Sequence, residues 1–284
     1  MLWAVFAGLA AVIETSKDGI IKHISSKHSS VVLAWSFFLI AIPLFAIPYV
    51  LFPPQVIQTH FWWALVARTV LDGAALILFF KAVRASDLSI TIPMISFTPV
   101  FLLFTSPLIG EVIPPLGVLG VCLVVIGAYV THSGRAGGVF EPLKAMVSEP
   151  GPRLMLGVAI LWTGSSTFHR IGIDAANAFA WNFFGSIALV LALLPFVIMR
   201  RKTVRATFKS GRWLLAGGIA YAAGDTALML AITHGTVAYS IAIKRLSILG
   251  SVLLGGWVFK ELGLARRLVG AGVMVSGAIV ILVA

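Results

Sequence analysis

Long apolar segments, separated by short polar connections, follow one another along the whole chain. A helix that crosses a bilayer needs about 20 mostly apolar residues, because the hydrocarbon core is about 30 Å thick and each helical residue rises about 1.5 Å. Ten segments are long enough to cross. We therefore predict transmembrane helices near residues 2–22, 31–52, 61–81, 88–109, 114–132, 154–173, 178–199, 212–233, 236–259 and 266–284.

The polar connections divide the chain in two. Pro53-Pro54 and Pro114-Pro115 mark turns, and residues 133–152 form the one long polar linker. On this pattern, residues 1–132 and 153–284 are two units of five helices each.

The two units share a sequence pattern. Each has a glutamate followed at the same spacing by two glycines, with an offset of 150 positions between the units: Glu111, Gly120 and Gly127, then Glu261, Gly270 and Gly277. Upstream of them, Ala34-Trp35-Ser36-Phe37-Phe38 matches Ala180-Trp181-Asn182-Phe183-Phe184. An odd number of helices per unit forces the second copy to cross the membrane in the opposite direction. The predicted fold is an all-α membrane protein of ten transmembrane helices, arranged as two inverted five-helix repeats.

We interpret the repeated residues as structural. Small residues spaced seven apart on one helix face let two helices approach closely. Glu111 and Glu261 each precede the last helix of a unit, where a carboxylate stabilises the positive helix N-terminus by about 0.3–1 kcal/mol.

Composition excludes a soluble protein. Apolar residues make up 60% of the chain and charged residues 11%, with a mean hydropathy of +1.04, whereas a soluble domain carries about 25% charged residues. Membrane lipid is therefore the expected partner of much of the surface. The net charge of +11 gathers in short connections, as topology determinants do, so we expect no nucleic-acid partner. Cys122 is the single cysteine, which excludes an intrachain disulfide.

The basic residues also predict an orientation. Most of them fall at the connections that follow the first, third, fifth, seventh and ninth expected helices. Because positively charged connections stay in the cytoplasm, this distribution places both chain termini outside.

Lys244 and Arg245 lie eight or nine residues inside the expected helix 236–259. A charge within a spanning helix costs several kcal/mol (about 2.5–3.5 on insertion scales) unless it is paired or hydrated, so each one marks a candidate site. We expect the two cations to bind a phosphate or carboxylate group, with Arg245 engaging two oxygens at once. The alternative is an internal ion pair with Asp225, Asp72 or a carboxylate of the first helix.

The first expected helix carries Glu14, Lys17 and Asp18, followed by Lys22. The spacing of three and four residues predicts the ion pairs Glu14–Lys17 and Asp18–Lys22 within the helix. The alternative is that Glu14 or Asp18 exchanges protons or contacts substrate.

Asp72 and Asp225 lie at similar depth in the third and eighth expected helices. Two carboxylates that face one cavity suit a proton or cation coupling site, or balance the charge of Lys244 and Arg245. Both interpretations stay open at this point.

The residues resemble those of the drug/metabolite transporter superfamily, in its ten-helix EamA-type branch. The resemblance rests on Pro107-Leu108-Ile109-Gly110-Glu111, on Trp257-Val258-Phe259-Lys260-Glu261 and on Lys22 at the end of the first helix. It implies a ten-helix fold and transport of a small solute. It also implies that both termini lie in the cytoplasm, contrary to the charge distribution.

Within that superfamily, sugar-phosphate translocators carry a similar Lys-Arg pair, together with a basic residue in the sixth helix. The resemblance implies that His169, beside Arg170, belongs to the substrate site. Trp162 and Trp181 lie near helix interiors and are candidates to line the cavity, although contacts with lipid or other helices fit equally well.

Taken together, the pattern predicts a secondary active transporter, an exporter or exchanger of a small polar metabolite with an anionic phosphate or carboxylate group, working by alternating access. No phosphate-binding G-x-x-x-x-G-K-[ST] loop, metal-ligand motif or compact catalytic cluster occurs, so we expect no cofactor, no metal and no enzymatic activity. The alternatives are a proton-coupled exporter of amino acids or cationic drugs, and a membrane-embedded transferase. We expect a monomer or homodimer in the bacterial cytoplasmic membrane, with a proton or counter-substrate as a further partner.

Overall fold

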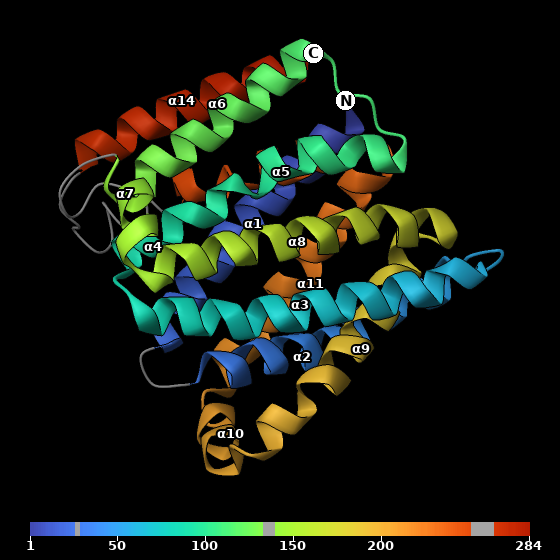
Figure 1. Cartoon of the computed structure of the whole chain (residues 1–284). Helices are drawn as coiled ribbons and strands as arrows, with labels where there is room; N and C mark the ends of the chain where they lie inside the picture. Colours follow the sequence, from blue (N-terminus) through green and yellow to red (C-terminus); the bar gives the residue numbers. More distant parts are fainter. Residues whose placement is uncertain (26–28, 133–139, 251–263) are drawn as a thin grey trace.

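The computed structural model describes residues 1–25, 29–132, 140–250 and 264–284, and the regular elements within them are helices. The long helices match expected membrane segments: α1 (Leu2–Ser25), α2 (Ser30–Leu51), α3 (Thr59–Ala85), α6 (Pro115–His132), α8 (Pro150–Ala175), α9 (Ala178–Ile198), α11 (Gly211–His234) and α14 (Leu264–Val283) (Figure 1). Short helices α7 (Glu141–Ser148) and α10 (Arg201–Phe208) lie in the connections.

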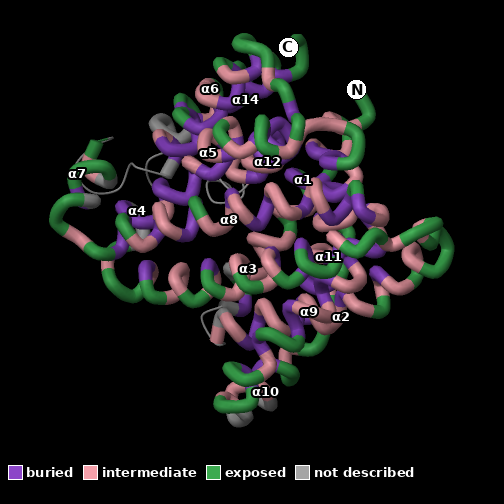
Figure 2. The backbone as a smooth tube through the Cα atoms, turned by 45° about the vertical axis from the view of Figure 1, so that its right-hand side comes forward, coloured by how far each residue is buried: buried purple, intermediate pink, exposed green. Residues whose placement is uncertain are grey.

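The helices have the length and surface of an integral membrane protein. In the described part of the chain, five helices are long and apolar enough to cross a bilayer: Val31–Leu51, Thr59–Ala85, Ile92–Ile109, Ala178–Ile198 and Gly211–His234. Shorter apolar helices cover Pro115–Thr131 and Leu268–Val283. Figure 2 shows buried positions inside the bundle and exposed ones on its outer faces. Many of the exposed residues have large apolar side chains, such as Val66 and Val70 on α3. The prediction of an all-α membrane protein is confirmed.

Each long helix before the linker packs along a helix that follows it. α1 runs along α11, α2 along α9, α3 along α8 and α6 along α14, which lies beside it in Figure 1. The parts of the chain on either side of residues 133–139 therefore interlock and bury apolar surface against each other.

Glycines bring α6 and α14 into backbone contact. A Cβ on Gly127 would lie 2.5 Å from the carbonyl oxygen of Gly270, and one on Gly120 would lie 2.9 Å from that of Gly277. The expected close approach at the repeated glycines is confirmed. The pairing is reciprocal, since Gly120 and Gly127 correspond to Gly270 and Gly277 in the repeat, and it makes the two helices antiparallel.

The expected helix 88–109 is helical along its whole length, but it is not α-helical throughout. The segment is divided into α4 (Leu88–Thr91), the 3₁₀ helix η1 (Ile92–Phe97), α5 (Thr98–Thr105) and the 3₁₀ helix η2 (Ser106–Ile109). Prolines cause the division, because each lacks an amide hydrogen and clashes with the preceding turn; they begin η1, α5 and η2.

The ninth expected helix is interrupted as well. α12 (Val237–Lys244) ends at the cationic pair, and Arg245 and Leu246 form a turn. Bonds from Ile248 N to Arg245 O and from Leu249 N to Leu246 O span three residues across this turn, and the chain is α-helical again over residues 247–250. Residues 251–263, with Glu261, lie outside the described part.

Candidate substrate site

Glu14 of α1 lies close to two cations, Lys17 on its own helix and Lys244 on α12. Its carboxylate lies 2.6 Å from Lys17 Nζ, the pair expected from their spacing, and 3.7 Å from Lys244 Nζ. Lys244 therefore has the carboxylate of the first helix as a partner, which was one of its two expected roles. Asp18 acts electrostatically on Lys17, and the side chain of its expected partner Lys22 lies outside the described part.

Arg245 is held by neutral oxygens. Its Nη2 donates to the carbonyl of Ile95 at 3.4 Å and to Oγ1 of Thr98 at 3.5 Å, both in the interrupted fourth segment. Its Nε is buried without a hydrogen-bond partner, and no carboxylate of the described residues lies within ion-pair distance. The guanidinium charge is therefore not neutralised by direct contact.

The contact of Arg245 with Ile95 joins positions that are far apart in the chain. The two residues are 150 positions apart, the same offset as the repeated glutamates and glycines. The contact therefore joins two positions that correspond in the sequence pattern. Both chain segments are non-helical or 3₁₀ there, a local structure that broken helices of transporters use to line a central site.

A second ion pair lies on α3, and its arginine contacts α9. Arg68 Nε is 3.2 Å from the carboxylate of Asp72, one turn away on the same helix, and Arg68 is only 4% exposed. The guanidinium lies over the Trp181 ring, 5.4 Å from its centre, and its Nη1 lies against Gly185. Asp72 is therefore balanced by Arg68. Sequence reasoning left Arg68 without a role, although the spacing of four residues indicates this pair.

His169 and Trp181 are bound to each other in the core. Trp181 Nε1 donates to His169 Nδ1 at 2.7 Å, and the ring of Phe61 packs edge-on against the indole. Both side chains are buried, whereas Trp162 is partly exposed and stacks on Phe79. Their expected contact with substrate stays a prediction.

The charges of both ion-paired groups act on Asp225. It is partly buried on α11, and no hydrogen bond or ion pair joins it to another described residue. Lys244, Lys17, Arg68 and Asp72 all act on it electrostatically. Asp225 thus connects the charges of α1 and α12 with those of α3.

The charges of the described interior side chains are equal in number. Four cations and four carboxylates interact there: Lys17, Arg68, Lys244 and Arg245, then Glu14, Asp18, Asp72 and Asp225. Within this described set there is no excess of positive charge, so an anion bound among these residues adds a net negative charge to them.

The connection between α11 and α12 is fixed from both sides. Glu111, which was expected at the N-terminus of the following helix α6, instead accepts from the Val237 amide at 2.9 and 3.1 Å at the start of α12. Arg170 donates to the carbonyls of Ile232 and Gly235 at 3.0 and 3.2 Å at the end of α11. The charges match the helix termini, because the N-terminus is positive and the C-terminus negative.

Glu111 is itself strongly buried. It is 8% exposed and also accepts from the Ser106 hydroxyl at 3.1 Å. Burial raises the pKa of its carboxyl group, while the bonds from Val237 and Ser106 act in the opposite direction. The sequence could not indicate this partner, since Val237 is 126 positions away.

The model of the EamA-like transporter family matches residues 1–133 and 150–283. The chain belongs to this family. It is therefore an integral membrane transporter protein of the drug/metabolite transporter superfamily, and the resemblance seen in the sequence is confirmed.

Other comparisons support the fold of this EamA-like protein. A solved structure described as the crystal structure of a protein is 16% identical, covers 98% of this chain and 95% of its own, and superposes with a TM-score of 0.75. At this identity the likeness shows the fold alone. No curated protein matches the chain.

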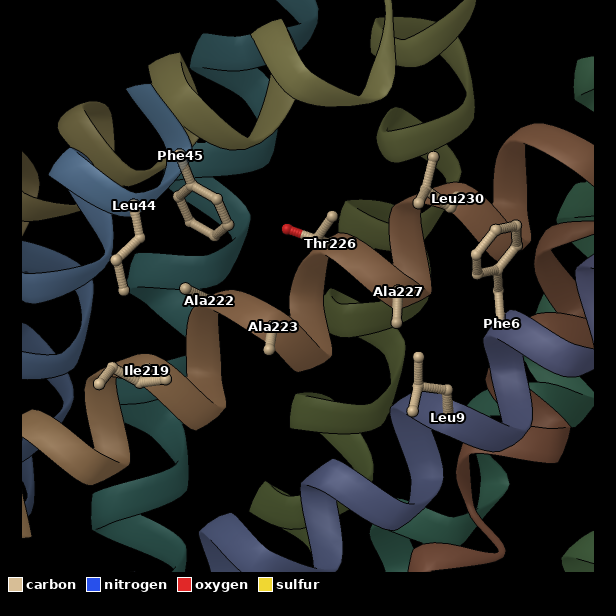
Figure 3. A pocket seen from close by; sticks show the side chains of 10 residues that line it. All are labelled: Phe6, Leu9, Leu44, Phe45, Ile219, Ala222, Ala223, Thr226, Ala227 and Leu230. Carbon is tan, nitrogen blue, oxygen red and sulfur yellow. The ribbon is translucent and has the colours of Figure 1, made fainter. Parts of the chain in front are cut away.

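An apolar groove opens between α1, α2 and α11 of the EamA-like chain (Figure 3). Its volume is about 330 Å³, and the lining residues are Phe6, Leu9, Leu44, Phe45, Ile219, Ala222, Ala223, Thr226, Ala227 and Leu230. The Thr226 hydroxyl is the one polar side-chain group in that lining. None of the candidate charged residues takes part, so this groove is not the expected polar site.

Proposed function

We propose that the chain is a secondary active transporter of a small polar metabolite that carries a phosphate or carboxylate group. The observation that carries this proposal is Arg245, a guanidinium inside the bundle that is bound to neutral oxygens and has Lys244 beside it. Arg presents planar, paired donors that match the oxygens of either anion. The proposal assigns no chemical step to the chain, which acts by binding and moving its substrate in a bacterial cytoplasmic membrane.

Lys244 supplies the second half of the anion site. It is 3.7 Å from Glu14, while Lys17 lies much closer to that carboxylate at 2.6 Å. An entering anion can therefore take Lys244 from Glu14 without leaving the carboxylate unpaired. This exchange links substrate binding to the position of α12 relative to α1.

Two inverted units provide the alternating access. The helix pairing supports this layout: α1 with α11 corresponds to α8 with α3 when the two units are exchanged, and α6 packs antiparallel to α14 through reciprocal glycines. Two units of the same fold and opposite orientation can exchange conformations with each other. A site between them is then open to one side of the membrane in one state and to the other side in the other state.

Charge balance implies a coupling partner. Moving a net charge through the low-dielectric bundle is costly, and the interior charges of the described residues are balanced before the anion binds. A proton or cation that enters with the substrate, or an anion that leaves in exchange, restores neutrality. Asp225 is the coupling candidate, because it has no direct partner among the described residues, whereas Asp72 is paired with Arg68 and Glu14 with Lys17.

The experiment is a binding screen followed by transport. Phosphorylated metabolites, carboxylic acids, amino acids and organic cations are tested for thermal stabilisation of the purified protein, and the best compound is used for uptake into proteoliposomes. We expect Lys244→Ala and Arg245→Ala to abolish uptake without lowering protein yield. Lys81→Ala is the matched control, because Lys81 is exposed near the end of α3. Unchanged uptake by both site variants would exclude the anion site.

The second candidate is a proton-coupled exporter of amino acids or cationic drugs. The unpaired carboxylate of Asp225 favours it, since an organic cation needs such a partner. Stabilisation of the wild-type protein by organic cations alone, lost in Asp225→Asn and kept in Arg245→Ala, would favour this candidate over the first.

A further inference from the structure

Asn182 is an unpaired amide in the middle of the protein. It is 1% exposed on α9, and neither its Oδ1 nor its Nδ2 has a hydrogen-bond partner among the described residues. Burying a polar group without a partner costs about 1–3 kcal/mol. Leucine has the same number and branching of side-chain heavy atoms and avoids this cost, so the polar amide itself has no structural explanation here.

Arg68 brings a second unpaired donor to the same place. Its Nη1 is buried without a partner, and it lies 2.0 Å from where a Cβ on Gly185 would be. Gly185 follows Asn182 by three residues, and positions with this spacing have Cβ atoms about 5–6 Å apart on one helix face. The unpaired guanidinium nitrogen and the unpaired amide are thus neighbours across the contact between α3 and α9.

The amide is directed toward the polar interior. Successive helical residues turn by about 100°, so Asn182 points between the directions of Gly185 and Ser186. Gly185 contacts Arg68 of α3, and Ser186 faces Tyr221 of α11, one turn before Asp225. Asn182 therefore points into the wedge between α3 and α11, on the side where Asp225 lies.

We propose that Asn182 and Arg68 form a second subsite, which binds a neutral hydroxyl or carboxamide group of the substrate. This inference rests on the proposed function, in which Arg245 and Lys244 bind the anionic end. Asparagine offers one acceptor and two donors, a match for groups that both donate and accept. Arg68 adds donors, and since Asp72 neutralises its charge, the subsite does not demand a second anion. Movement of α9 relative to α3 during alternating access admits the substrate.

Matched probes separate the two subsites. Glycerol 3-phosphate and n-propyl phosphate share an anionic head and differ in hydroxyl groups, as do glycerate and propionate. Thermal midpoints of the purified protein are measured with each probe. We expect both phosphates or both carboxylates to stabilise the wild-type protein, with the larger shift for the hydroxylated probe of the pair.

Asn182→Leu is the decisive variant. Without ligand its thermal midpoint should equal or exceed that of the wild-type protein, because an unpaired amide has been removed. It should keep the response to the plain anion and lose the added shift of the hydroxylated probe. Arg245→Gln should lose the response to both.

Asn177→Leu is the matched control, from the same helix. Asn177 Oδ1 accepts from the Ala180 amide at 2.8 Å, and its Nδ2 donates to Phe52 O at 3.0 Å, so its replacement should lower the midpoint and leave probe discrimination intact.

Three results would overturn the subsite while sparing the anion site: a wild-type protein that responds to the anions without distinguishing hydroxylated from plain probes, an Asn182→Leu variant that still distinguishes them, or one that is destabilised as Asn177→Leu is. A wild-type protein that responds to none of the four probes would instead remove the anion site, and the subsite with it.

Discussion

At the scale of single residues, the two interior arginines differ in what neutralises them. Arg68 has a carboxylate one turn away, whereas Arg245 has carbonyl and hydroxyl oxygens. A buried ion pair is fixed, because removing either partner leaves an isolated charge. A guanidinium with neutral partners can exchange them for an anion at lower cost. This difference supports the proposed roles: Arg245 binds the anionic end of the substrate, while Arg68, whose charge Asp72 balances, offers its remaining donor to the proposed second subsite.

The Arg68–Asp72 pair gives a direct test of that distinction. We expect Asp72→Asn to lower the thermal midpoint in detergent clearly, because breaking a buried pair costs about 3–5 kcal/mol. Asp174→Asn breaks a pair of similar length, but Asp174 is 54% exposed, so its loss should cost about 0–1 kcal/mol. Equal thermal midpoints for the two variants would show that the protein's stability does not depend on the pairing of Arg68 with Asp72.

Residue spacing predicts some of these contacts and misses others for a clear reason. The pair of Glu14 with Lys17 follows from their separation along one helix, and the pair of Arg68 with Asp72 follows the same rule. Contacts between segments that are far apart in the chain have no such signal. The bonds of Glu111 to Val237 and of Arg245 to Ile95 belong to this second group.

At the scale of helices, the bilayer allows membrane-spanning segments to be predicted from hydropathy. Every backbone group inside lipid must be satisfied within the element, so long apolar segments form helices whatever their side chains. Length therefore located the described spans well. Interruptions follow a different rule, because Pro93, Pro99 and Pro107 divide the fourth segment without changing its apolar character. Such local breaks place Ile95 and Thr98 where Arg245 can reach them.

The close approach of α6 and α14 can be tested by adding a side chain to one of its glycines. A side chain on Gly127 would push against the Gly270 carbonyl, which cannot move without its helix. We expect Gly127→Val to destabilise the protein by about 1–3 kcal/mol, as overpacking does. Gly73→Ala on α3 is the control: nothing lies within 4 Å of its added Cβ, and alanine favours helix by about 1 kcal/mol over glycine. A Gly127→Val midpoint at or above that of Gly73→Ala would disprove the close contact. Thermal unfolding in one detergent measures both.

At the scale of the whole molecule, the α11–α12 connection and the proposed anion site lie at opposite ends of one short helix, α12. α12 begins at the Val237 amide, which Glu111 holds, and ends at Lys244 and Arg245. A movement of α12 that releases or admits an anion therefore also strains the hydrogen bond between the Val237 amide and Glu111 at its other end. Glu111 and Arg170 thus act as positioning residues for the α11–α12 connection on one membrane face. Which face this is depends on the orientation of the chain.

The charge pattern and the family resemblance predict opposite orientations of the chain in the membrane. The basic residues place the termini outside, and with them the α11–α12 connection. We expect a C-terminal alkaline phosphatase fusion to be active, because that enzyme needs the oxidising side of the membrane for its disulfides. A fluorescent protein fused there should stay dark, and both results should reverse for fusions after Phe208 in the basic connection of α10. Fluorescence at the C-terminus with active phosphatase after Phe208 would establish the inverted placement. The α11–α12 connection held by Glu111 and Arg170 would then lie on the cytoplasmic face.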